Sequence, residues 1–192
     1  MALIGVWTNS SYNPLTYEQQ QNNAYYIWQY FQARGWTMES VSAMLGNIQF
    51  ESYINPAQWQ AGHTIEDPNY PNDTGFGLVQ WTPWQKYAEW AGSDYRTNYQ
   101  KQLARIQYEL ENGLQWITQY GNMSFYDFTQ STASVSYLAR VFEYNYERGT
   151  WSDYRSQYAE NWYTYLSGSP QPPAPGGGNI PIWLLFKIKG LI

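Results

Sequence analysis

The sequence predicts an α+β fold that is mostly α-helical, with a single small β-hairpin lobe. Two observations indicate the helices: apolar residues recur at helical spacing in several separate segments, and capping residues stand before most of them. A third observation indicates the hairpin. Residues 57–81 are rich in turn-forming residues and end in the short apolar run F-G-L-V-Q-W, which favours a strand.

The first helix is predicted by a capping box, in which Thr16 stands three residues before Gln19. It runs over about residues 17–32 and ends before Gly35, a residue type that is common at helix C-termini. Thr37 is the predicted N-cap of the next helix. Four apolar residues of that helix recur at i, i+3, i+4 and i+7 and form one face: Val41, Met44, Leu45 and Ile48.

One turn beyond this apolar face, the pattern reaches Glu51. A carboxyl group in an apolar position is expected to be buried, and burial raises the pKa of a carboxyl. A carboxyl that keeps its proton beside a cleft can act as a general acid. The alternative is a solvated residue at a helix end, because Asn55-Pro56 stops any helix nearby.

The remaining helices are predicted from the same signals. Thr82, followed by Pro83, is the expected N-cap of a short helix that ends near residue 91. Thr97 and Gln100 form a second capping box, before a helix that ends at about residue 111. Further helical segments are expected over residues 125–130 behind Ser124, over 133–146 and over 152–166, with 114–117 as one extra turn.

Composition argues against several classes of function. The 192-residue chain has a net charge of −5 and no basic stripe, which argues against nucleic acid as a partner. It has no Cys, and its one His, His63, cannot form a zinc site alone. We therefore expect no metal and no cofactor. Aromatic residues make up 20% of the chain, beside many Asn and Gln, a mixture typical of surfaces that stack on sugars or bases.

The sequence divides into one domain and two short C-terminal segments. Residues 1–166 form the predicted domain, and residues 167–179 form a linker rich in Pro and Gly. Residues 180–192 are an apolar tail that is shorter than the ~20 residues a membrane-spanning helix needs. We favour docking of this tail on a partner chain or on the domain itself over seating in a membrane interface. The first residues lack the basic and apolar parts of a signal peptide.

Three motifs stand out: G-W-T at residues 35–37, M-L-G-N-I-Q-F-E-S-Y-I-N-P at 44–56 and G-F-G-L-V-Q-W-T-P at 75–83, with the shorter Y-E-R at 146–148. Together they resemble the phage tail-associated lysozymes, the peptidoglycan-cleaving tail-tip proteins of small phages of Gram-positive bacteria. The resemblance covers about residues 17–166. It implies a lysozyme-like fold, with a cleft between a helical domain and the hairpin lobe, and it implies that Glu51 is the catalytic glutamate.

In that family a metallopeptidase domain often follows the linker, whereas fourteen residues follow Gly178 here. The resemblance therefore implies cleavage of the glycan strand alone. Glu51 would protonate the glycosidic oxygen between N-acetylmuramic acid and N-acetylglucosamine. A second carboxylate would face the positive charge that develops, and Asp73 is the first candidate, ahead of Asp67 and Glu66. If none of these lies near Glu51, substrate assistance and lytic transglycosylase chemistry are the alternatives.

Four further residues are predicted to bind substrate: Phe76, Gln80, Trp81 and Tyr146. Gln80 can bond the acetamido group of a sugar. Trp81 can offer a ring face to a pyranose, and core packing is the competing interpretation for this residue. For Glu147, beside Arg148, a structural ion pair is favoured over a place on the cleft wall.

These observations predict a muramidase that acts on peptidoglycan glycan strands, is carried by a phage tail and works outside the host cell. Bacterial walls are anionic, so an acidic hydrolase gains no electrostatic steering toward them. Attachment to a virion supplies local concentration instead, and other tail proteins are the expected partners through residues 180–192. Two alternatives stay open: a glycan-binding or structural tail module without catalysis, and a free endolysin.

Overall fold

The computed structural model describes residues 15–60, 73–150 and 152–170. Within these ranges the predicted predominance of helix is confirmed, and no helix is long and apolar enough to cross a membrane. The predictions for residues 1–14, His63, Glu66, Asp67, most of the linker and the tail concern residues outside these ranges.

The elements in chain order are α1 (Tyr17–Gln32), α2 (Met38–Ser52), α3 (Gln85–Ala91), α4 (Gln100–Glu111), α5 (Phe125–Gln130), α6 (Val135–Phe142), the π-helix η2 (Glu143–Glu147) and α7 (Asp153–Ser167).

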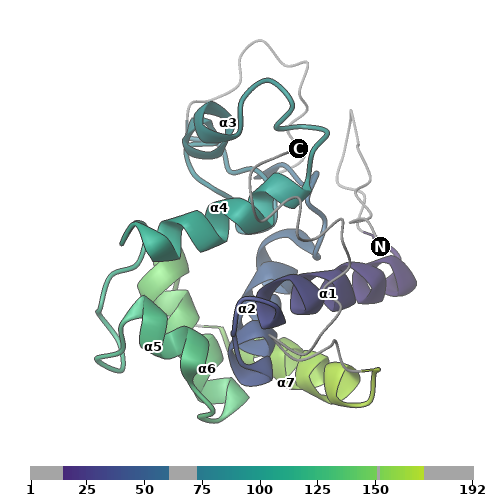
Figure 1. The fold of residues 1–192 in the computed structure, drawn as a ribbon, viewed down its shortest axis with the longest axis vertical. Coiled ribbons are helices and arrows are strands. Elements are labelled where there is room, and N and C mark those ends of the chain that lie inside the picture. Colours follow the sequence, from purple (N-terminus) through teal and green to yellow (C-terminus); the bar gives the residue numbers. More distant parts are fainter. Residues whose placement is uncertain (1–14, 61–72, 151, 171–192) are drawn as a thin grey trace.

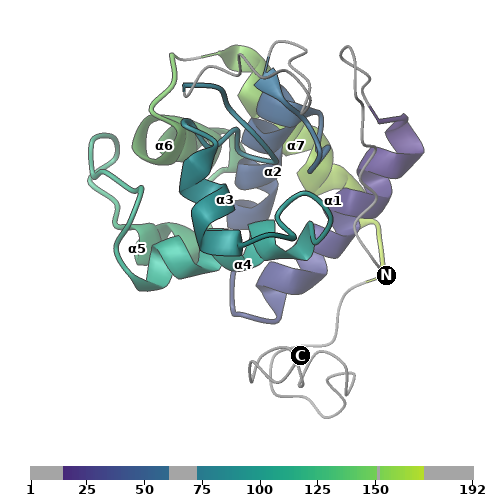
Figure 2. The same cartoon turned by 90° about the horizontal axis from the view of Figure 1, so that it is seen from above.

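Helix α2 occupies the centre of the helical body (Figure 1). Helices α7 and α6 pack against it most extensively, and α1 and α5 also contact it. Helices α3 and α4 pack on each other, and α4 lies between α3 and the helical body (Figures 1 and 2). The C-terminal end of α2 therefore lies where the helical body meets the part of the molecule that contains α3 and α4.

The apolar stripe predicted for α2 is confirmed, because all four of its residues are fully buried. Two of the buried polar residues of α2, Asn47 and Ser52, form hydrogen bonds to other segments of the chain. The amide of Asn47 donates to the carbonyl oxygens of Ala43 and Ala139, at 2.9 and 3.0 Å. The hydroxyl of Ser52 donates to the carbonyl oxygen of Leu78, at 2.9 Å. These bonds offset the cost of taking polar groups out of water and hold the last turns of α2 in place.

Gly46 lets α7 approach α2 closely. A Cβ atom at position 46 would lie 2.4 Å from the carbonyl oxygen of Arg155 and 2.6 Å from the Cβ of Ala159. Both atoms belong to the rigid part of α7, so the helices would have to separate to make room. The close approach is what places Arg155 against the last turns of α2.

Gly46→Ala is expected to lower the free energy of unfolding by about 1–3 kcal/mol, because overpacking a dense interior forces backbone shifts. Urea denaturation followed by circular dichroism measures the change. Gly168→Ala is the matched control, since its nearest neighbour to an added Cβ is 3.6 Å away, and it should stay within about 0.5 kcal/mol. Equal midpoints for the Gly46 variant and the wild type would contradict the close-packing argument.

Three of the predicted helix starts are confirmed. Thr16 forms the complete capping box with Gln19. The side chain of Thr37 accepts the backbone N–H of Ser40, and Ser124 caps α5 in the same way. Each cap satisfies a donor that the helix leaves without a partner.

Two other predicted caps are wrong, because Thr82 and Thr97 do not cap α3 and α4. The hydroxyl of Thr82 donates to the carbonyl oxygen of Gln80, at 2.9 Å. The hydroxyl of Thr97 donates to that of Asp94, at 3.2 Å. Such local bonds compete with capping, and both helices start about three residues later than the Thr positions.

The predicted strand over residues 76–81 is not formed. Phe76 and Trp81 make an isolated bridge through backbone bonds of 3.3 and 3.1 Å, and Phe76 also bridges to Trp59. Between Phe76 and Trp81 the chain makes a turn in which Gly77 has a φ of +85°. The side chain of Gln102 fills this turn and accepts a backbone N–H from it at 2.8 Å. A residue of α4 therefore holds this segment as a turn, and among the described residues the lobe contains bridges instead of a hairpin.

The helix predicted over residues 133–146 divides into α6 and the π-helix η2. Asn145 of η2 bonds a neighbouring segment: its Oδ1 accepts the N–H groups of Gln119 and Tyr120 at 3.1 and 2.7 Å, and its amide donates to Tyr120. Residues 114–117 are not helical, contrary to the prediction, and Gln115 has a φ of +64°. A π-turn inserts one extra residue into a helix and is frequent at functional sites.

Candidate active site

A cavity of about 490 Å³ lies at the C-terminal end of α2. Its volume falls within the ~300–1,000 Å³ that is usual for ligand pockets. Amide, carboxyl, cationic and indole side chains from distant parts of the chain form its wall. The lining residues are Glu51, Gln58, Trp59, Gln60, Val79, Gln80, Trp81, Thr82, Lys86, Gln115, Tyr146, Glu147 and Arg148.

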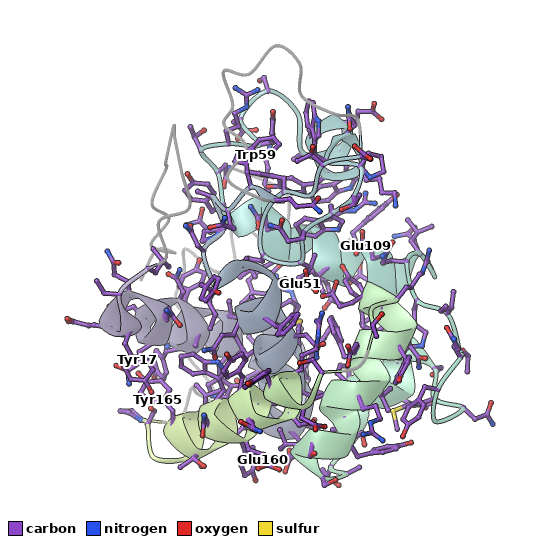
Figure 3. The ribbon with its side chains drawn as sticks, turned by 180° about the vertical axis from the view of Figure 1, so that it is seen from behind. Tyr17, Glu51, Trp59, Glu109, Glu160 and Tyr165 are labelled. Atoms are coloured by element: carbon purple, nitrogen blue, oxygen red, sulfur yellow. The ribbon has the colours of Figure 1, made fainter. Side chains whose placement is uncertain are left out.

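Glu51 projects from the last turn of α2 into this cavity, and Figure 3 shows it between Trp59 and helix α7. Its side chain is 23% exposed, so it is neither fully buried nor fully solvated. Its Oε1 accepts a hydrogen bond from Nη2 of Arg155 at 2.6 Å. The helical pattern predicted an apolar setting for this carboxyl, and the structure shows an ion pair instead.

Arg155 of α7 is the buried centre of this arrangement, at 3% exposed. Its Nη1 donates to Oδ1 of Asn47 at 3.0 Å, and its Nε lies 3.2 Å from Oε1 of Glu143. The centre of its guanidinium group lies 4.2 Å from the ring centroid of Phe50. Asn47, Phe50 and Glu51 are spaced i, i+3 and i+4, so a single face of α2 receives the guanidinium group.

Two further carboxyl groups lie beside this ion pair. Burial raises the pKa of Glu143, and the charge of Arg155 only partly opposes the effect. Burial also raises the pKa of Glu147 well above its usual range, and the negative charge of Glu51 raises it further. Among the described residues, Oε1 of Glu147 has no hydrogen-bond partner. A carboxyl whose pKa is raised takes up a proton more readily than an ordinary glutamate does.

Glu109 of α4 fixes two of the rings that line the cavity. It is 1% exposed, and its Oε1 accepts from Nε1 of Trp81 at 3.1 Å and from Nε of Arg105 at 2.8 Å. Its Oε2 accepts a hydrogen bond from the hydroxyl of Tyr146. Burial and the charge of Glu109 raise the pKa of Tyr146 well above its usual value, so that hydroxyl remains a donor.

Of the residues predicted to bind substrate, Gln80, Trp81 and Tyr146 line the cavity together with Glu51. The amide nitrogen of Gln80 donates to two backbone carbonyl oxygens, at 3.1 and 2.8 Å, which leaves its Oε1 as an acceptor for an acetamido N–H. Trp81 is 3% exposed and its ring stacks on Tyr87, with centroids 4.8 Å apart. Trp81 therefore packs in the core and also forms part of the wall.

Phe76 and Asp73 are not among the lining residues. Phe76 is fully buried, and its ring packs on Trp59 with centroids 4.4 Å apart. Asp73 is an exposed residue of a turn. In the part of the chain that the structure describes, the second carboxyl that lines the cavity with Glu51 is Glu147, and Asp73 does not reach it.

The predicted ion pair between Glu147 and Arg148 is wrong, since none is formed between these two described residues. Arg148 instead donates from Nη2 to the carbonyl oxygen of Gln115 at 2.6 Å. The motif Y-E-R already contained Glu147, but no local pattern pointed to its raised pKa. The partner of Glu51, Arg155, lies 104 residues away in the sequence and carries no local signal of its role.

The backbone around the cavity is conformationally unusual. Six non-glycine residues of the described part have a positive φ, and three of them line the cavity: Gln80, Gln115 and Arg148. Each such conformation costs on the order of 1–3 kcal/mol, and such residues cluster at functional sites. This cluster supports a functional role for the cavity.

The arrangement suits acid–base chemistry. Two carboxyl groups line one cavity, and their environments differ: Glu51 is bonded to a guanidinium group, whereas burial and neighbouring carboxyl groups raise the pKa of Glu147. Such a pair divides acid and base roles between two residues of the same type. In the described residues, no group of three or more His, Cys, Asp or Glu side chains is placed to hold a metal ion.

Comparison with known proteins relates the chain to phage proteins. Residues 22–166 match a family model that is described as phage tail lysozyme. The chain is 42% identical over 158 residues to morphogenesis protein 1 of Bacillus phage B103. The matched region covers 80% of this chain and 42% of that relative, so the chain spans less than half of the relative's length.

Proposed function

The chain belongs to the phage tail lysozyme family, and from this premise we propose that it cleaves the glycan strands of peptidoglycan, with Glu51 as the general acid. The bond proposed is the one between N-acetylmuramic acid and N-acetylglucosamine. One observation carries the proposal: Glu51 projects from the end of the central helix into a cavity whose other walls bear amide groups and indole rings. Such walls suit acetamido sugars, which have both apolar ring faces and polar edges.

In this reaction the proton of Glu51 passes to the glycosidic oxygen while the bond from C1 to that oxygen breaks. Oε1 of Glu51 is held by Arg155, which leaves Oε2 to carry the transferred proton. Gln80 accepts the acetamido N–H, and the indoles of Trp59 and Trp81 border the sugar. The ion pair with Arg155 fixes the direction of the carboxyl before the sugar arrives, so less entropy is lost in the transition state.

The setting that we propose is a phage tail, with the host cell wall as the site of action. The family and the relative from a Bacillus phage support a virion-associated protein. An acidic enzyme is repelled by an anionic wall, and delivery by a particle removes the need for electrostatic attraction. The partners in the tail are then other tail proteins, through the segment 180–192.

A second candidate is a glycan-binding module without catalysis. The observation that favours it is the contact between Glu51 and Arg155, because a side chain of the protein already occupies one oxygen of this carboxyl. The two candidate functions differ in whether the protein cuts glycan strands and releases soluble fragments.

Digestion of purified Bacillus peptidoglycan, followed by mass spectrometry of the soluble fragments, tests the proposal. We expect fragments that end in reducing N-acetylmuramic acid, because hydrolysis adds water across the bond. Fragments that end in a 1,6-anhydro sugar, which lack that water, would identify a lytic transglycosylase. Binding to the wall without any released fragment would identify the non-catalytic module and contradict the proposal.

A further inference from the structure

We propose that Glu147 is the second catalytic carboxyl, the base that takes a proton from the attacking water. This inference rests on the proposed function, and it replaces Asp73 in that role. Glu147 is the last residue of η2, and it lines the same cavity as Glu51, which lies in the last turn of α2. Two separate elements thus bring one carboxyl each to a single space, which is the arrangement that glycoside hydrolysis requires.

In the part of the chain that the structure describes, Glu147 forms no ion pair that would explain its position. Its neighbours are occupied elsewhere: the hydroxyl of Tyr146 donates to Glu109, and Arg148 donates to the carbonyl oxygen of Gln115. Oε1 of Glu147 is buried without a hydrogen bond among the described residues. A buried oxygen without a partner costs on the order of 1–3 kcal/mol, and in native proteins such a group calls for a functional reason.

Charged groups of four elements act on the pKa of Glu147. They are Glu51 of α2, Glu109 of α4, Glu143 of η2 and Arg155 of α7. Arg155 is already bonded to Glu51 and paired with Glu143, and two further cations, Lys86 and Arg148, line the same cavity. Burial and the neighbouring carboxyl groups raise the pKa of Glu147, and a raised pKa makes a carboxylate a better acceptor of a proton.

The proposed reaction needs one protonated and one ionised carboxyl. In the reactive form Glu51 bears the proton and Glu147 is ionised. Glu51 gives its proton to the glycosidic oxygen, which leaves with the electron pair of its bond to C1. A water oxygen bonds to C1, and the proton released by that water passes to Glu147.

Cleavage produces two sugar ends. After the reaction Glu147 is protonated and Glu51 is ionised. Transfer of the proton back to Glu51 through cavity water restores the reactive form. Because one water attacks directly, the new reducing end has the opposite anomeric configuration to the bond that was cut.

Kinetics of Glu147→Gln and Glu147→Ala on soluble peptidoglycan fragments test the proposal, with Glu160→Gln, an exposed carboxyl of α7, as the matched control. Both Glu147 variants should lose about a hundredfold or more in kcat with little change in KM, and the low-pH limb of the kcat profile should disappear. Azide is an anion that attacks C1 without a base. It should therefore restore turnover to Glu147→Ala and give a glycosyl azide of inverted configuration.

Full kcat in a folded Glu147→Gln protein, or a lost kcat in Glu147→Ala that azide does not restore, would overturn the assignment of Glu147. Retention of anomeric configuration, read by NMR at early times, would overturn it as well. An inactive wild type would instead remove the proposed function on which the assignment rests. Urea denaturation of each variant shows that the comparison is made between folded proteins.

Discussion

Glu51→Gln is expected to lower the rate of peptidoglycan cleavage by about 10²–10⁴-fold, which is the usual contribution of a general acid. The amide has the shape of the carboxyl, and its oxygen can still accept the bond from Nη2 of Arg155. The fold and the cavity should therefore persist while the transferable proton is lost. The initial rate of turbidity loss in a suspension of purified walls measures the change.

Glu160→Gln is the control for this measurement, because it makes the same chemical change at an exposed site on α7, away from Trp59 and Glu51 in Figure 3. It should clear walls at the wild-type rate. A Glu51→Gln protein that clears walls as fast as this control would end the assignment of Glu51 as the acid.

Arg155→Met is expected to produce the largest loss of stability, about 3–5 kcal/mol, because it removes one partner of a buried ion pair and leaves the others uncompensated. Glu143 is fully buried, and without Arg155 it would have to be protonated to avoid a buried, unpaired charge. The acceptor Oδ1 of Asn47 would also lose its bond. Urea denaturation at neutral pH measures the free energy of unfolding.

The double variant Arg155→Met with Glu143→Gln separates charge from packing. If the loss of stability comes from an uncompensated carboxyl, Glu143→Gln should restore part of the free energy of unfolding, because contacting residues are energetically coupled. An Arg155→Met protein with the wild-type midpoint would show that the guanidinium group does not hold this site together.

The features that local patterns determine were predictable from the sequence. The apolar stripe of α2 and the caps at Thr16, Thr37 and Ser124 depend on residues within one or two turns. The position of Glu51 at the end of that stripe follows from the same pattern. These features place the central helix and one carboxyl of the candidate site.

The features that were missed depend on contacts between distant segments. The turn at residues 77–80 is held by Gln102 of α4, so a run of residues that favours a strand does not form one. The π-helix coincides with the bonds that Asn145 makes to residues 119 and 120. Helical spacing alone predicted an uninterrupted helix there.

Contacts between distant segments also explain which features of the candidate site were not predicted from the sequence. The ion pair of Glu51 needs Arg155, which only the close approach at Gly46 brings near. The raised pKa of Glu147 results from burial and from the negative charges of Glu51 on α2, Glu109 on α4 and Glu143 on its own element, η2. The spacing of residues in the sequence could indicate a carboxyl beside a cleft, but it carries no information on which carboxyl has a raised pKa.

The most direct test of proton delivery by Glu51 compares two substrates with the same sugar and different leaving groups. A natural glycosidic oxygen needs a proton to leave, whereas 2,4-dinitrophenolate leaves without one. Glu51→Gln should be slower than wild type by about a hundredfold or more on the natural substrate. On the dinitrophenyl glycoside it should come within about tenfold of wild type. An equal loss on both substrates would contradict proton delivery by Glu51.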